Sequence, residues 1–363
     1  MAEPADPLVT VVIPTFRRPS MLRRAIASAV TQDSRVVVCV YDNGADAATH
    51  GVVAEFAGKG HAVRYHAHAK NIGANANFAY GLAQVRTPFF VILSDDDLLL
   101  PGMVDRAMRQ FDANPKTLFV ASAVLLVEPG GRVLRVVGRW PSGLYDVPRG
   151  LINMAAREHF TWTGTVFRRT ALELAGSLDP EMGLLSDLDL LLRIAARGSF
   201  AVVDEPGAIF AWHPDSNSSL PTLDQFWPGW QRIAERVRSE AAVPQPVAVT
   251  AADRLERRLA GKLLLVGLFA SSRGRIGEAR AAAELVARPF HRPVAAALIL
   301  GVAWLAARSR RIQTALHRLA WMVRWPSRRS MHAIQSEFDR EHRASFMLAE
   351  ASTEQGSGNN VAA

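Results

Sequence analysis

Residues 89–102 read FFVILSDDDLLLPG, an apolar run that leads into three adjacent aspartates. The run has the length and composition of a buried strand, so the sequence predicts a strand that ends at Asp95, Asp96 and Asp97. Burying even one unpaired carboxylate costs several kcal/mol. These side chains therefore need water, the N-terminus of a helix or a cation as their partner.

Strand-like and helix-like patterns alternate through the residues before this run. Strand-like segments occupy residues 8–14, 35–42 and 62–68, and helix-like segments occupy residues 20–32, 52–60 and 75–85, the first of them behind a capping Ser20. This order predicts an α/β fold, a parallel sheet with helices on both faces. Ligands of such sheets bind beyond the carboxyl ends of the strands.

Polar residues follow each predicted strand at this edge of the sheet. They are Pro14, Thr15 and Arg17 after the first strand, Asp42 and Asn43 after the second, Lys70, Asn71 and Gly73 after the third, and the three aspartates after the fourth. Neither a G-x-G-x-x-G fingerprint nor a G-x-x-x-x-G-K-[ST] loop is present to hold phosphates. A divalent cation would serve instead, because Mg²⁺ takes oxygen ligands and bridges carboxylates to phosphates. A solvated helix cap is the alternative for the aspartates.

Four segments in this order resemble the family 2 glycosyltransferases, inverting enzymes of GT-A fold that use nucleotide-diphosphate sugars. They are VTVVIPTFRRPSMLRRAIASAVTQ (9–32), VYDNGAD (40–46), KNIGANANFAYGLAQV (70–85) and FFVILSDDDLLLPG (89–102). Residues 163–198, TGTVFRRTALELAGSLDPEMGLLSDLDLLLRIAARG, resemble the acceptor-side segment of the family. The resemblance extends over residues 8–215 and implies a Rossmann-like mixed or parallel sheet.

The resemblance implies a donor pocket around the strand ends. Its residues would be Pro14, Thr15 and Arg17 along the nucleotide, Asp42 at the base with Asn43 beside it, and Lys70, Asn71 and Gly73 closing the pocket. Asp96 stands where the family has its metal-binding carboxylate, with Asp95 and Asp97 beside it on the ribose, the metal or the sugar. Many relatives have Asp where Ser94 stands, so the metal motif is either Asp95-x-Asp97 or Asp96 alone. His213 matches a histidine near the diphosphate and metal, although a lone histidine is more often structural.

The resemblance also implies an acceptor side. Asp187 matches the general base, and Asp189 is the competing carboxylate near the acceptor pocket. Trp162, before Gly164, would form the floor of the acceptor or sugar pocket, or would be a plain core residue. The chemistry needs both kinds of carboxylate: one takes the proton of the acceptor hydroxyl, and others hold a cation beside the departing diphosphate. Arg17 and Ser186 depart from the family, in which many members have Asn and Glu.

The C-terminal part of the chain is basic and helix-like. Residues 253–330 contain 16 lysines and arginines against 4 acidic residues, in a chain of 363 residues with a net charge of +8. The apolar piece 294–307 is shorter than the ~20 residues of a membrane-spanning helix. Residues 311–325, RIQTALHRLAWMVRW, have the composition of a helix that lies on anionic lipid. The alternative is a helical subdomain packed on the sheet domain or on a second subunit.

We therefore predict an N-terminal extension (1–7), a GT-A glycosyltransferase domain (8–220), a basic helical region that associates with membranes (221–348) and a disordered tail (349–363). A single cysteine, Cys39, and the lack of a signal-peptide pattern predict a cytoplasmic location, on the inner face of the cytoplasmic membrane.

The predicted function is sugar transfer in cell-surface polysaccharide synthesis, with Mg²⁺ or Mn²⁺ as cofactor. The predicted partners are a nucleotide-diphosphate sugar, a glycan or lipid-linked glycan acceptor, an anionic membrane surface and a further copy of the chain, but no nucleic acid. A non-catalytic sugar-nucleotide-binding protein with the same fold stays open as an alternative. So does a nucleotidyltransferase, although PTFRRPSM has no glycine to hold a triphosphate.

Overall fold

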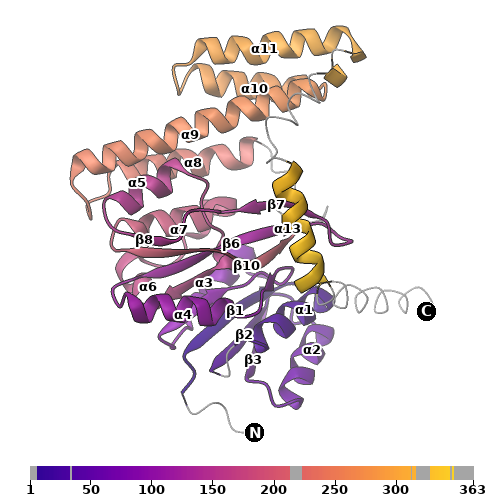
Figure 1. Cartoon of the computed structure of the whole chain (residues 1–363), viewed down its shortest axis with the longest axis vertical. Coiled ribbons are helices and arrows are strands. Elements are labelled where there is room, and N and C mark those ends of the chain that lie inside the picture. The colour runs from indigo at the N-terminus through magenta and orange to yellow at the C-terminus, as the bar shows by residue number, and fades with distance from the viewer. Residues whose placement is uncertain are drawn as a thin grey trace. The chain divides into compact units, whose positions relative to one another are not determined.

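A computed structural model describes residues 6–32, 35–212, 223–311, 313–315, 328–343 and 346 of the chain (Figure 1). The chain divides into two compact units. The first, called here the sheet unit, comprises Met1–Gly150, Glu158–Ser219 and Arg329–Ala363. The second, the helical unit, comprises Leu151–Arg157 and Leu220–Arg328. Most of the predicted extension 1–7 and all of the predicted tail 349–363 lie outside the described residues.

The first half of the sheet unit alternates strands and helices as predicted. The strands are β1 (Val9–Thr15), β2 (Val36–Asp42), β3 (Val63–Ala67) and β4 (Phe89–Ile92), and the helices between them are α1 (Pro19–Val30), α2 (Ala47–Gly58) and α3 (Ala74–Ala83). The strands pair in parallel in the order β3-β2-β1-β4. Nearly every residue of β1, β2 and β4 is buried, because helices cover the parallel sheet. The predicted cap at Ser20 is wrong: α1 begins at Pro19 behind Arg18, because proline fits the first position of a helix.

The second half makes the sheet mixed. Its strands are β5 (Leu98–Leu99), β6 (Phe119–Val127), β7 (Val133–Val137), β8 (Gly143–Tyr145), β9 (Thr165–Arg168) and β10 (Phe200–Ala211). Strand β9 lies antiparallel between β4 and β6, and β10 lies parallel to β6 and antiparallel to β5 and β8. Since β9 runs opposite to β4, the residues that precede Thr165 lie at the end of β4 that carries the aspartates.

Helices and short 3₁₀ turns connect these strands. They are α4 (Met103–Ala113), α5 (Arg149–Ala156), the 3₁₀ turn η1 (Trp162–Gly164), α6 (Thr170–Ala175), the 3₁₀ turn η2 (Pro180–Leu185) and α7 (Ser186–Ala195). A large cluster of buried apolar residues combines β1, β2, β4 and the inner faces of α1, α2 and α4. This cluster fixes the strand ends where the candidate site lies.

The predicted helical region 221–348 is divided between the two units. Helix α13 (Arg328–Glu341), yellow in Figure 1, lies beside β7 in the sheet unit. Phe338 and Phe346 are buried there against Leu98, Leu125 and Ile209. The side-chain oxygen of Gln335 also accepts a hydrogen bond from the Val133 amide at 2.8 Å.

The helical unit contains α8 (Leu223–Arg238), α9 (Gln245–Ser272), α10 (Ile276–Ala287) and α11 (Pro293–Arg308). Helix α9 contacts the other three, and α10 contacts α11 (Figure 1). Among the described residues no helix has the length and hydropathy to cross a membrane. Most of the segment 311–325, which was predicted to lie on anionic lipid, is outside the described residues, and only residues 311 and 313–315 of it are described.

Candidate active site

Two of the three aspartates meet the last residue of β1 or a residue just after that strand. The hydroxyl of Thr15 donates a hydrogen bond of 2.7 Å to Oδ2 of Asp95. The guanidinium of Arg18 lies 3.4 Å from Oδ1 of Asp95 and 3.3 Å from Oδ2 of Asp96. These contacts follow from the fold, because β1 and β4 are neighbouring parallel strands. The sequence patterns did not single out Arg18; its position just after a strand end was the only signal for it.

Burial and like charge act on two of the three aspartates. Burial and the neighbouring Asp96 raise the pKa of Asp95 to about 6, although Thr15 and Arg18 oppose the shift. Burial and the neighbouring Asp96 also raise the pKa of Asp97 well above its ordinary value. A divalent cation would oppose both shifts by favouring the ionised carboxylates.

Asp97 turns into the protein. Its side chain is 1% exposed, its Oδ2 accepts a 2.7 Å hydrogen bond from the Thr163 hydroxyl, and its Oδ1 accepts one of 3.1 Å from the Ala211 amide. Thr163 lies in η1, and Ala211 is the last residue of β10. Asp97 therefore ties two distant segments to the end of β4.

The residues after β2 and β3 form one connected loop system. Asp42 is fully buried and accepts hydrogen bonds from the amides of Gly44 and Asp46 and from the Tyr65 hydroxyl, at 2.8–2.9 Å. In this arrangement Asp42 shapes the turn that follows β2.

Asn43 links that turn to the segment before α3. Its amide nitrogen donates to Oδ1 of Asn71, and its oxygen accepts from the Ile72 amide, both at 2.8 Å. Gly73 precedes α3 with a φ of 87°, a value that side chains other than glycine rarely adopt. Lys70 is exposed at the same segment. The fold thus brings together two predicted donor-binding segments.

The other predicted donor residues lie at the end of β1 and just after it. Pro14 is buried in β1 opposite Tyr41 of β2. Arg17 is exposed, has a φ of 54° and places its guanidinium 5.2 Å from the centre of the Phe16 ring. Arg17 and Arg18 therefore face different surroundings, and of these two arginines it is Arg18 that contacts Asp95 and Asp96.

Asp187 lies in the first turn of α7 and is partly exposed. Its Oδ1 accepts a hydrogen bond of 2.7 Å from the Leu188 amide, and its Oδ2 lies 3.5 Å from Nε2 of His159. The exposed fractions of the Asp187 and His159 side chains are 18% and 19%. Asp187 is therefore in contact with solvent. The sequence patterns missed His159, because it is close to Asp187 only in the fold.

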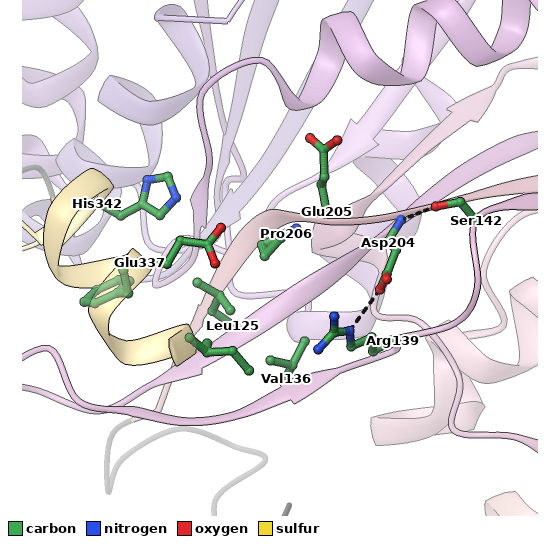
Figure 2. A pocket seen from close by; sticks show the side chains of 11 residues that line it. Leu125, Val136, Arg139, Ser142, Asp204, Glu205, Pro206, Glu337 and His342 are labelled. Atoms are coloured by element: carbon green, nitrogen blue, oxygen red, sulfur yellow. Dashed lines mark hydrogen bonds and ion pairs between the residues drawn. The ribbon is translucent and has the colours of Figure 1, made fainter. Parts of the chain in front are cut away.

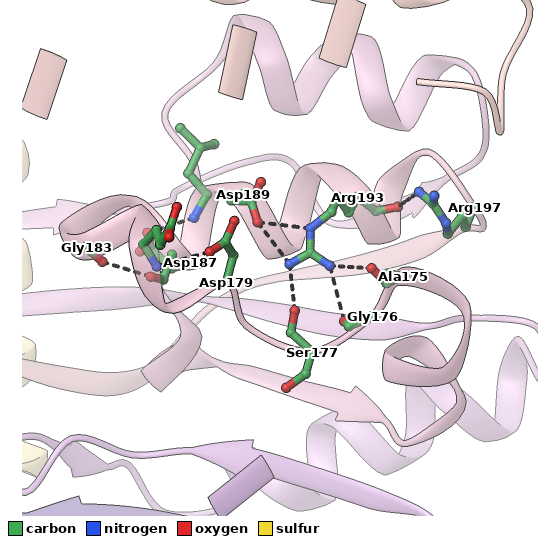
Figure 3. A network of polar contacts seen from close by, with 12 residues as sticks. Ala175, Gly176, Ser177, Asp179, Gly183, Asp187, Asp189, Arg193 and Arg197 are labelled. Carbon is green, nitrogen blue, oxygen red and sulfur yellow. Dashed lines mark hydrogen bonds and ion pairs between the residues drawn. The ribbon is translucent and has the colours of Figure 1, made fainter. Parts of the chain in front are cut away.

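Asp189 has a structural environment, shown in Figure 3. Its side chain is 1% exposed and pairs with the Arg193 guanidinium at 2.9 Å. That guanidinium also donates to the backbone carbonyls of Ala175, Gly176 and Ser177. Asp189 thus anchors α7 to the loop after α6 and is badly placed to take a proton from an acceptor.

Trp162 and Gly164 lie in η1, at the end of β4. The Trp162 ring lies 4.6 Å from the Phe78 ring of α3, between ring centres. A Cβ atom added at Gly164 would come within 2.4 Å of a methyl carbon of Val124, so this position requires glycine. The side-chain nitrogen of Asn75 donates a hydrogen bond of 2.9 Å to the backbone carbonyl of Pro180, which joins α3 to η2. Segments predicted to lie on the donor side and on the acceptor side therefore meet within the sheet unit.

The metal assignment fits only part of the predicted ligand set. His213 lies outside the described residues. Over the part of the chain that the structure describes, no group of three or more His, Cys, Asp or Glu side chains forms a metal cage. Asp95 and Asp96 do converge on one cation, the Arg18 guanidinium. Two carboxylates suit Mg²⁺, which is commonly held by one or two of them together with substrate phosphates.

A cavity of about 350 Å³ lies elsewhere in the sheet unit, between α13 and the strands β6, β7 and β10 (Figure 2). Leu125, Asp204, Glu337 and His342 are among its lining residues. None of the three aspartates lines it. This cavity is therefore separate from the candidate site at the ends of the parallel strands.

The sequence is similar to known glycosyltransferases. Residues 10–173 match the family model described as glycosyl transferase family 2. An uncharacterized glycosyltransferase of Rickettsia bellii is 29% identical over 132 residues, which are 35% of this chain and 19% of that protein. The GalNAc(5)-diNAcBac-PP-undecaprenol beta-1,3-glucosyltransferase of Campylobacter jejuni is 31% identical over 106 residues, 29% of this chain and 34% of that protein. The matches span only about a fifth to a third of the length of these relatives.

The structure is similar to S. aureus TarS. The TM-score is 0.58 at 14% sequence identity, over 86% of this chain and 54% of that one. TarS 1–349 in complex with UDP-GlcNAc also gives 0.58 at 14% identity, over 84% of this chain and 92% of that one. This likeness confirms the predicted GT-A-like mixed sheet with a C-terminal helical region, and the family match confirms the predicted resemblance.

Proposed function

Residues 10–173 belong to glycosyl transferase family 2, and from this premise we propose that the chain transfers a sugar, with inversion, from a nucleotide-diphosphate sugar to a glycan acceptor. The observation that carries the proposal is the pair Asp95 and Asp96, held around Arg18 at the carboxyl end of parallel strands. Such an edge is where α/β sheets bind ligands. Residues 8–220 would form the transferase domain.

Residues after β1, β2 and β3 would bind the donor. Thr15 and Arg18 hold Asp95 in place, and Asn43 and Asn71 fix the loop that precedes α3. A divalent cation, Mg²⁺ or Mn²⁺, held by Asp95 and Asp96 would supply positive charge beside the diphosphate as it departs. Asp97 would contribute by holding η1 and β10 in position rather than as a ligand.

Asp187 would act as the general base. The acceptor oxygen forms a bond to the anomeric carbon on the face opposite the nucleotide. The bond from that carbon to the diphosphate oxygen breaks, and the nucleoside diphosphate leaves with the electron pair. The proton of the acceptor hydroxyl passes to the Asp187 carboxylate. His159, 3.5 Å away, would orient that carboxylate.

The acceptor would be a lipid-linked glycan, and the chain would work at the inner face of the cytoplasmic membrane in cell-surface polysaccharide synthesis. The name of the Campylobacter jejuni relative, which specifies a PP-undecaprenol substrate, supports this acceptor class. The basic residues of the C-terminal part support a site next to anionic lipid.

The test is release of nucleoside diphosphate from a panel of sugar nucleotides that includes UDP-GlcNAc, with Mg²⁺ or Mn²⁺ and a bacterial lipid extract. We expect release that depends on the cation and on the extract, and at least a hundredfold loss in Asp96→Ala. Full activity of Asp96→Ala would reject the metal assignment. Tight binding of a sugar nucleotide without turnover on any extract would instead favour a non-catalytic protein. Ser186 supports this alternative, because it stands where many relatives have Glu, is buried and donates a hydrogen bond to the Gly183 carbonyl.

A further inference from the structure

Helix α11 of the helical unit carries an unusual apolar surface. The described residues include ten large apolar side chains that are strongly exposed, and half of them lie on this one helix. They are Val294 (83% exposed), Leu298 (51%), Leu300 (44%), Trp304 (55%) and Leu305 (41%). We call these five residues the α11 face. Val294, Leu298 and Leu305 share one side of the helix, and Leu300 and Trp304 lie along its border.

The orientation of this face is set by packing on the opposite side of the helix. Ala296, Ile299, Ala303 and Ala306 are buried there against α9 and α10. A Cβ atom added at Gly267 of α9 would lie 2.8 Å from Ile299, so the two helices approach closely at this point. The Ser271 hydroxyl also donates to the Ile299 carbonyl at 3.3 Å. Helix α11 cannot roll to bury its exposed face without losing this packing.

Positive charge borders the α11 face at both ends. Residues 285–311 include five arginines and no acidic residue. Arg288 and Arg292 precede the helix, and Arg308, Arg310 and Arg311 end or follow it, all of them exposed. The guanidinium of Arg308 stacks over the Trp304 ring at 3.5 Å from its centre. An indole with a cation beside it suits the boundary between lipid tails and headgroups.

We propose that the α11 face is the surface by which this chain binds an anionic membrane, with α11 lying flat in the headgroup region. The apolar residues enter the lipid, and the bordering arginines meet lipid phosphates. A second copy of the chain fits less well, because a symmetric contact would bring two sets of arginines together without acidic partners. The inference deepens the proposed function, whose lipid-linked acceptor would lie in the same membrane. It adds a lipid contact on α11 to the one predicted for residues 311–325, most of which lie outside the described residues.

Vesicle flotation of the full chain tests the proposal. One set of vesicles contains equal parts of phosphatidylglycerol and phosphatidylcholine, and the other contains phosphatidylcholine alone. We expect binding to the anionic vesicles that weakens with salt. The double variant Leu298→Asp, Leu305→Asp should lower the ratio of bound to free protein roughly tenfold or more. Arg308→Gln with Arg310→Gln should lower it about fivefold for each arginine.

The chain offers a matched control in the sheet unit. Leu174 and Leu144 are 54% and 42% exposed, close to the values for Leu298 and Leu305. The variant Leu174→Asp, Leu144→Asp should float as the unchanged chain does. The proposal is overturned if the α11 variant floats as well as the unchanged chain, or if the control variant loses as much flotation as the α11 variant. So does a shift from dimer to monomer in the α11 variant with flotation intact, which would identify the face as a contact between copies.

The outcomes separate this proposal from the proposed function. Nucleotide release from a sugar nucleotide in detergent does not require the membrane, so the α11 variant should keep it. Failure of all turnover with flotation still dependent on Leu298 and Leu305 would reject the transferase function and leave the membrane surface standing. Normal turnover with flotation that does not depend on Leu298 and Leu305 would reject the membrane surface and leave the transferase function standing.

Discussion

The assignment of Asp187 and Asp189 to different roles makes a paired prediction. Each is replaced by asparagine, which keeps the shape and removes the charge. Asp189→Asn leaves Arg193 as a buried cation without its carboxylate, and breaking such a pair costs about 3–5 kcal/mol. Three backbone carbonyls still accept from that guanidinium, so we expect the lower end, about 3 kcal/mol. In a domain of this size that corresponds to a fall in melting temperature of roughly 6–12 °C.

Asp187→Asn should have the opposite profile. The amide oxygen can still accept from Leu188, and the side chain is partly exposed, so the melting temperature should change by only a degree or two. Loss of the base should reduce turnover by roughly a hundredfold to ten-thousandfold.

The assay combines thermal unfolding with release of nucleoside diphosphate, measured well below the melting temperature of the weaker variant. Sugar-nucleotide binding serves as the control for a folded donor site and should persist in both variants. The reasoning is refuted if Asp189→Asn melts normally but is inactive while Asp187→Asn turns over at the full rate.

Three further predictions concern the charge, the packing and the last helix of the sheet unit. The pKa of Asp95 is raised from 3.8 to about 6 in the folded state, so the folded chain binds the carboxyl proton of Asp95 more tightly than the unfolded chain does. The free energy of unfolding therefore falls as pH rises from about 4 to about 6. In EDTA, the free energy of unfolding of Asp95→Asn should therefore exceed that of the unchanged chain by up to about 3 kcal/mol at pH 7, as measured by urea unfolding. A difference between the two proteins that does not vary with pH would contradict this. Gly164→Ala should cost about 1–3 kcal/mol through overlap with Val124, and the cost should shrink in a Val124→Ala background, as a double-mutant cycle would measure. Phe338→Ala should cost about 3–5 kcal/mol in the same unfolding assay because its ring is 1% exposed, and an unchanged value would mean that α13 does not pack on the sheet.

The alternation of the first four strands with helices could be predicted from the sequence, most clearly for β1, β2 and β4, which are short apolar runs. Buried parallel strands need apolar residues on both faces, and polar residues must follow where the strand reaches the sheet edge. The positions of Asn43 and Asn71 at one edge follow from that rule, and the structure joins them by a hydrogen bond.

The antiparallel insertion could not be predicted in the same way. Strand β9 has only four residues, and its pairing with both β4 and β6 depends on contacts between segments far apart in sequence. The division of the C-terminal region could not be predicted either, since α13 and α9 are both helical, yet α13 packs within the sheet unit and α9 belongs to the helical unit. Helical periodicity shows which residues share a face; it does not say what that face contacts.

Arg18 and His159 were missed for a related reason. Each acts on an aspartate that lies far away in the chain, and neither belongs to a pattern with recognisable spacing. Sequence spacing identifies residues that share a strand end or a helix turn. Side-chain partners across a sheet depend on register, which a mixed sheet fixes only once all its strands are placed.

The three aspartates at residues 95–97 illustrate how adjacent residues of one kind can have different partners. They leave the end of β4 in a turn, closed by the bond from the Asp97 amide to the Ser94 carbonyl, so their side chains diverge. Asp95 turns toward Thr15, and Asp97 turns toward Thr163 and the end of β10. Asp96 is more exposed than its neighbours and shares Arg18 with Asp95. The three carboxylates therefore differ in geometry: Asp95 and Asp96 share Arg18, which is why we propose them as the ligands of a cation, and Asp97 holds the surrounding segments.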